Sequence, residues 1–75
     1  MPFINIKVIQ GVFTPEEKRE MVERVSEAVI AVEGEALRPV THTTITETPS
    51  GEWAVGGQAM TAGDVKQLRS VAAPA

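Results

Sequence analysis

Two runs rich in β-branched residues, separated by one well-capped helix pattern, constrain what this chain can fold into. The first run, Phe3–Ile9, alternates apolar side chains at every second position and predicts a strand that begins almost at the amino terminus. The second run, Val40–Glu47, is rich in threonine and predicts a strand with one half-apolar face. A strand, a crossover helix and a second strand favour a right-handed βαβ unit with parallel strands.

The segment between the two runs has the features of a helix from Pro15 to about Glu33. Thr14 can cap its first turn, and Glu17 completes a capping box. One helical stripe of apolar residues follows, made of Met21, Val22, Val25, Ala28, Val29 and Val32. Ile30 falls outside this stripe, so we expect it to be either an exposed apolar residue or a contact with another subunit.

The patterns become shorter after the second run. Arg38-Pro39 is interpreted as a connection that precedes this run, and Trp53-Ala54-Val55 as a short strand that Gly56-Gly57 ends. From Thr61 onward the periodicity fades. We therefore predict one domain over residues 1–75, in which about 62–75 form a C-terminal arm or tail.

Composition limits the class of protein. A chain of 75 residues buries only a small core, so we expect self-association to supply further buried area. The absence of cysteine excludes disulfides and thiolate zinc sites, and one histidine does not make a His-rich metal site. No secretory signal pattern or membrane-length apolar run is present, and a net charge of −3 offers no basic stripe for nucleic acid. We expect a cytoplasmic protein with no metal and no nucleic-acid or membrane partner.

Four short segments follow one another in a distinctive order and spacing. They are Pro2–Gly11, Val25–Ala28 within the acidic helix, Ile45–Glu47 and Gly51–Gly57. Together, from Pro2 to about Met60, they resemble the 4-oxalocrotonate tautomerase family. The resemblance implies an α+β fold, in which a βαβ subunit with parallel strands carries a short C-terminal β-hairpin and assembles as a hexamer. It also implies an isomerase that uses no cofactor and whose amino-terminal proline is the general base.

Removal of Met1 would leave Pro2 as a secondary amine at the chain end. Model α-amino groups titrate near pKa ~8, and burial among apolar side chains lowers that value because it disfavours the ammonium form. A base with a pKa closer to 7 can remove a proton from carbon beside a carbonyl group and return it elsewhere. The oxygen of the resulting enolate then needs a cation or a hydrogen-bond donor. We expect a substrate that is a small 2-oxo or 2-hydroxy-dienoate or a related carbonyl compound.

The chain departs from the family pattern at both of the family's arginines, which bind a carboxylate and polarise the carbonyl. Gly11 is followed by Val12-Phe13 where the family has an arginine, and His42 stands where the second arginine precedes Ile-Thr-Glu. An apolar pair cannot bind a carboxylate bidentately. Val12 would therefore only line the substrate site, and His42 would be either a hydrogen-bond donor to substrate or a structural residue.

The resemblance also assigns Trp53 and Ile9 to the wall of the substrate pocket, although each could equally be ordinary core packing. Three cations could replace the missing arginines, and Arg38 is favoured over Lys7 and Arg69 because it lies just before the second strand. The alternative for each cation is a solvated surface residue.

Two other functions stay open. The chain could be a non-standard family member, either one subunit of a mixed oligomer whose partner supplies arginines or a binding protein on the same scaffold. It could also be a structural module in which the proline is incidental.

Overall fold

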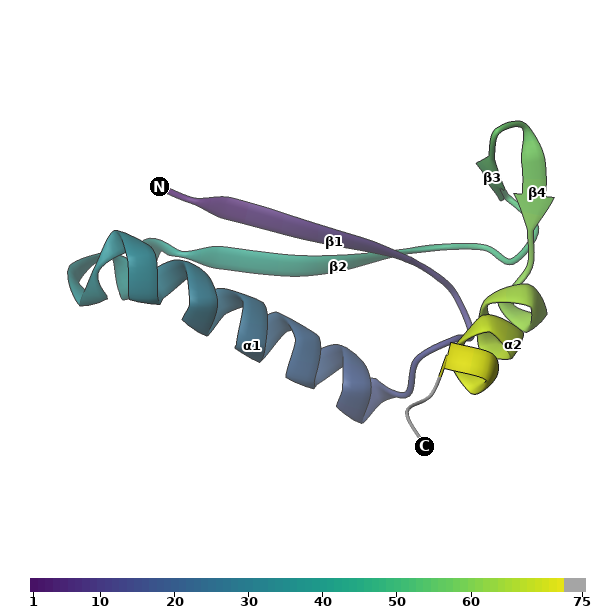
Figure 1. The fold of residues 1–75 in the computed structure, drawn as a ribbon. Coiled ribbons are helices and arrows are strands. Elements are labelled where there is room, and N and C mark those ends of the chain that lie inside the picture. The colour runs from purple at the N-terminus through teal and green to yellow at the C-terminus, as the bar shows by residue number, and fades with distance from the viewer. Residues whose placement is uncertain (73–75) are drawn as a thin grey trace.

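The computed structural model describes residues 1–72, which form a two-stranded parallel sheet with a long helix on one face (Figure 1). A small hairpin and a second helix lie beyond one end of this sheet (Figure 1). The elements in order are β1 (Phe3–Ile9), α1 (Pro15–Glu33), the 3₁₀-helix η1 (Glu35–Val40), β2 (His42–Thr48), β3 (Trp53–Val55), β4 (Gln58–Met60) and α2 (Ala62–Ala72). The predicted α+β fold, with its βαβ unit and its short hairpin, is confirmed.

Strands β1 and β2 are parallel, and their register runs from the pair Phe3 and His42 to the pair Ile9 and Thr48. The second strand begins two residues later than predicted and extends one residue further. In β1 the side chains of Ile4, Ile6 and Val8 are half-buried while those between them are exposed, as the alternation of the sequence predicts.

The capping box at the start of α1 is present. The backbone N–H of Glu17 donates to the Thr14 hydroxyl at 3.1 Å, and the N–H of Thr14 donates to the Glu17 carboxylate at 3.0 Å. The helix ends at Glu33, and the capping residue Gly34 has a φ of 109° that favours glycine. These local signals explain why the bounds of α1 match the prediction.

The prediction for the buried face of α1 was wrong at three positions, one of which is Ala28, expected within the stripe but exposed. Ile30, expected outside the stripe, is only 4% exposed, and Val32, expected within it, is 90% exposed. The face that packs on the sheet includes Ser26, whose hydroxyl lies 2.6 Å from that of Thr43 in β2. Ile30 also lies beside η1, which folds back over this side of α1 where only a plain connection was expected.

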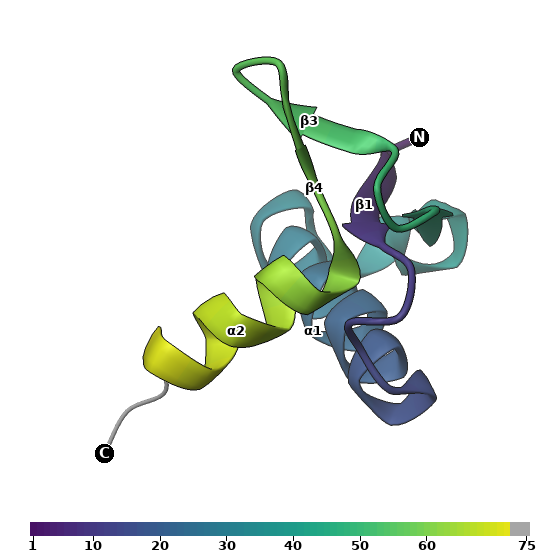
Figure 2. The same ribbon diagram turned by 90° about the vertical axis from the view of Figure 1, so that its right-hand side faces the viewer.

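The hairpin of β3 and β4 is antiparallel and turns at Gly56-Gly57. Helix α2 follows, where no helix was predicted. Its first turn is held by two reciprocal bonds between Thr61 and Asp64, at 2.9 and 3.1 Å. Seen from the hairpin end, α2 runs away from the βαβ unit (Figure 2). Residues 73–75, the last part of the predicted arm, lie outside the described residues.

The core of one chain is thin. Within residues 1–72 the buried apolar side chains are Ile9, Val12 and Ile30, at 6%, 6% and 4% exposure. The sheet face opposite α1 carries Phe3, which is 69% exposed. Neither α1 nor α2 is long and apolar enough to cross a membrane.

Candidate functional site

Pro2 lies at the edge of the sheet where both strands begin. Its side chain is half-buried, and its carbonyl accepts a hydrogen bond from the backbone N–H of His42 at 3.1 Å. This bond extends the β1–β2 ladder by one residue, so Pro2 and His42 occupy the same end of the sheet. His42 is exposed, and Met1 is 85% exposed. Two of the predicted site residues are thus brought together here.

Three others meet at the opposite end of the sheet. Ile9, Val12 and Trp53 line an open hollow of about 240 Å³, which we call the Trp53 hollow. Its remaining walls are mostly apolar and include Phe13 from the loop after β1 and Met60 from β4. The predicted pocket wall therefore exists as one surface, formed by the end of β1, the following loop and the hairpin.

One chain does not bring Pro2 to the Trp53 hollow. Pro2 precedes β1 and Ile9 ends it, and seven residues of strand at about 3.3 Å each span about 23 Å. The amino terminus and the hairpin accordingly lie at opposite ends of the molecule (Figure 1). A site that contains both needs more than one chain.

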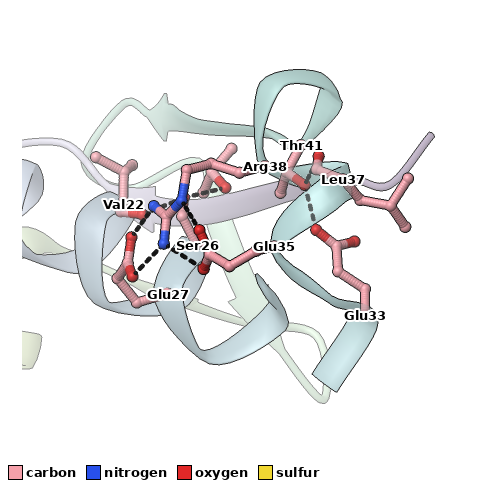
Figure 3. A network of polar contacts seen from close by, with 9 residues as sticks. Val22, Ser26, Glu27, Glu33, Glu35, Leu37, Arg38 and Thr41 are labelled. Atoms are coloured by element: carbon pink, nitrogen blue, oxygen red, sulfur yellow. Dashed lines mark hydrogen bonds and ion pairs between the residues drawn. The ribbon is translucent and has the colours of Figure 1, made fainter. Parts of the chain in front are cut away.

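Arg38, the favoured replacement for the missing arginines, is engaged elsewhere. Its guanidinium donates to both carboxylate oxygens of Glu27, at 2.6 and 3.0 Å, and to both of Glu35, at 2.9 Å (Figure 3). These bonds raise the pKa of Arg38 and lower the pKa of each carboxyl group below its usual value. Arg38 does not line the Trp53 hollow.

Arg69 fastens α2 to the loop after β1. Its guanidinium lies 2.6 Å from the Glu17 carboxylate, 3.4 Å from the Val12 carbonyl oxygen and 4.8 Å from the centre of the Phe13 ring. The hydrogen bond from Arg69, followed by the one from the Thr14 backbone, lowers the pKa of Glu17 to about 2. A cation thus does reach the residue that replaces the family arginine, but it is already paired with a carboxylate.

Lys7 is the residue that the sequence analysis undervalued. It lies on β1 two positions before Ile9 and lines the Trp53 hollow. The period-two alternation, which puts Lys7 and Ile9 on one face of β1, was the signal that could have found it. Among residues 1–72, no group of three or more histidine, aspartate or glutamate side chains is placed to hold a metal ion.

Comparison with known families gives one family model, described as "Tautomerase enzyme", which matches residues 2–63. A comparison with curated proteins gives no match.

Solved structures give further matches. A 4-oxalocrotonate tautomerase isozyme from Methylibium petroleiphilum is 31% identical, covers 85% of this chain and 97% of its own, and has a TM-score of 0.68. A heterohexamer 4-oxalocrotonate tautomerase from Chloroflexus aurantiacus is 28% identical, covers 80% and 94%, and has a TM-score of 0.71. TomN, a homologue in the tomaymycin biosynthetic pathway, is 20% identical with a TM-score of 0.68; it shares the fold over 97% of this chain and 100% of its own.

Proposed function

Because this chain belongs to the 4-oxalocrotonate tautomerase family of the tautomerase superfamily, we propose that it interconverts the enol and keto forms of a small 2-oxo or 2-hydroxy-dienoate or a related carbonyl compound. Pro2 is the general base once Met1 has been removed. The observation that supports this most is the Trp53 hollow, because it collects the apolar wall residues Ile9, Val12 and Trp53 on one surface.

The active site is shared between chains in this proposal. Each chain carries Pro2 at one end of β1 and the Trp53 hollow at the other, about 23 Å away at about 3.3 Å per residue. A second copy related by a two-fold axis and running antiparallel places its Pro2 against the hollow of the first, and the symmetry creates two equivalent sites. The open sheet face with Phe3 then provides a surface for further association, so we propose a homo-oligomer, and the hexamer is the assembly that the family resemblance implies.

The reaction needs only a proton and an electron pair to move. The unprotonated Pro2 nitrogen takes a proton from the carbon beside the carbonyl, and the C–H electron pair moves toward the carbonyl oxygen to form an enolate. The Pro2 ammonium then returns the proton to that oxygen or to a more distant carbon, which shifts the double bond. The apolar walls of the Trp53 hollow disfavour the ammonium form, so they lower the pKa of the Pro2 amine and keep part of it unprotonated near pH 7.

The other predicted residues have different places in this site. Trp53, Ile9 and Val12 exclude water, and His42, next to Pro2, offers one hydrogen-bond donor to the substrate oxygen. We leave Arg38 out of the proposed site because its guanidinium is committed to Glu27 and Glu35.

A second candidate is a subunit of a mixed oligomer. It is favoured by the two positions, Val12 and His42, where this chain lacks the arginines of the family pattern, and by the heterohexamer among its structural relatives. In that case the purified chain is inactive and becomes active only when a related, arginine-bearing chain is added.

Alkylation with 3-bromopyruvate tests the proposal, because an unprotonated proline nitrogen displaces bromide while an ammonium does not. Peptide mass spectrometry should find the adduct on Pro2 of the processed chain, with loss of phenylenolpyruvate ketonisation in proportion to labelling. The Pro2→Ala variant, which has a primary amine in place of the secondary amine, is the control for alkylation elsewhere. Rapid turnover by a fully labelled protein, or by Pro2→Ala, would exclude Pro2 as the base.

A further inference from the structure

The Trp53 hollow carries one charged residue among the described residues that line it, and this residue is Lys7. Lys7 and Ile9 project from the same face of β1 because they are two positions apart. The Lys7 side chain is exposed, whereas Ile9 beside it is 6% exposed and forms part of the apolar floor. The positive charge of Lys7 therefore lies at the edge of an apolar surface.

The charge of Lys7 is available, unlike that of the other two candidate cations. Arg38 is paired with Glu27 and Glu35, and Arg69 is paired with Glu17. Within residues 1–72, Lys7 makes no ion pair with a carboxylate. A substrate anion that meets Lys7 thus has no internal carboxylate to displace.

We propose that the Lys7 ammonium binds the carboxylate of the substrate, and that the substrate class is a monocarboxylic 2-oxo acid or its enol with an apolar tail. The role of Lys7 in turnover rests on the proposed function, whereas the binding of a carboxylate by Lys7 does not. The tail lies against Trp53 and Phe13, which supply aromatic surface in the same hollow. A second carboxylate would meet the apolar wall of the hollow without a second cation, so the site disfavours dicarboxylates.

The geometry also explains how the chain can lack the family's arginine after Gly11. The side chain at that position, Val12, is buried, so the carboxylate is bound from the strand instead of from the loop. An ammonium is a point charge with three donors and holds a carboxylate with less directional constraint than a guanidinium does. The site therefore binds one carboxylate without the bidentate geometry that an arginine would provide.

The test compares two substrates and three variants of the processed chain. The substrates are phenylenolpyruvate, which carries the carboxylate, and its methyl ester, which does not. Lys7→Gln should lower kcat/KM for the acid by about 10- to 100-fold, the range expected for one charge-assisted hydrogen bond, and leave kcat/KM for the ester nearly unchanged. Lys7→Arg should retain most of the activity on the acid. Lys66→Gln is the matched control, because Lys66 is exposed on α2 and does not line the hollow.

Two results would overturn the proposal: equal losses on the acid and the ester, or no loss on either. Should the wild type turn over neither substrate, the proposed reaction fails and binding still decides the role of Lys7. Calorimetric titration with phenylpyruvate should then give an affinity that Lys7→Gln weakens about tenfold or more and Lys66→Gln leaves unchanged. Equal affinities for wild type and Lys7→Gln, or no binding to the wild type, would contradict the assignment.

Discussion

Replacing Val12 by arginine would restore the residue type of the family pattern, yet the structure predicts that this substitution destabilises the fold. Val12 is 6% exposed, and a fully buried valine side chain contributes about 1.5–3 kcal/mol through burial alone. A guanidinium cannot stay in that position without a partner, so the new side chain must turn out to solvent and open the hollow. We expect Val12→Arg to lower the free energy of unfolding by at least this amount, which is about a 10- to 150-fold change in the unfolding equilibrium.

Urea unfolding followed by the fluorescence of Trp53, the single tryptophan of the chain, measures this loss. Protein concentration must be the same for every variant, because unfolding of an oligomer depends on it. Val32→Arg is the matched control, since Val32 is 90% exposed and the same replacement there should cost little. A Val12→Arg protein that is as stable as the wild type and gains turnover of the dicarboxylate 2-hydroxymuconate would refute the reasoning. Such a result would mean that position 12 can hold a guanidinium directed at the substrate without disturbing the packing around it.

Two further predictions concern stability. The pKa of Glu17 is lowered from 4.5 to about 2, so its pairing stabilises the fold above pH 4.5 and is lost as the pH falls toward 2. When the pH is lowered from 6 to 2.5, the Tm of Glu17→Gln should therefore fall less than the Tm of the wild type. Glu16→Gln is the control and should lose as much Tm as the wild type. Equal losses of Tm in Glu17→Gln and the wild type would contradict this prediction. Ile30→Ala should cost about 2–5 kcal/mol in urea unfolding because Ile30 is buried, whereas Val32→Ala should cost little, and the reverse order would support the buried stripe read from the sequence.

The backbone of this fold could be predicted because its signals are local. Period-two alternation located β1, and the reciprocal Thr14–Glu17 pair located the start of α1. Helix α2 was missed although Thr61 and Asp64 form the same kind of reciprocal cap. Val65, Leu68 and Val71 follow at helical spacing, so the sequence did carry a signal for α2 and the prediction overlooked it.

The buried face of α1 could not be predicted because it includes a polar residue. The Ser26 hydroxyl is hydrogen-bonded to the Val22 carbonyl oxygen and to the Thr43 hydroxyl, both at 2.6 Å. Ser26 can therefore lie against the sheet without leaving a polar group unpaired. A stripe drawn from the apolar residues alone included Val32 and left out Ile30.

The candidate site was predicted as a set of residues but not as an arrangement. A family pattern names Pro2 and Trp53 without saying that one strand separates them by its full length. Proximity along the chain favoured Arg38, but its pairing with Glu27 depends on the fold-back of η1, which the sequence did not indicate. Lys7 could have been named from the sequence. Its place in the hollow became clear only from the structure, because the hairpin puts Trp53 and Met60 beside it.

Removal of Met1 tests the central claim, that Pro2 is the base, most directly. While Met1 is attached, the Pro2 nitrogen is a tertiary amide with no useful basicity. Protein that retains Met1 would be treated with methionine aminopeptidase, while intact mass and phenylenolpyruvate ketonisation are followed in the same samples. Activity should be absent at the start and rise in proportion to the processed fraction, with the lower limb of its pH profile below the pKa of ~8 of a free amino terminus. Full activity in the unprocessed protein, unchanged by cleavage, would show that Pro2 is not the base.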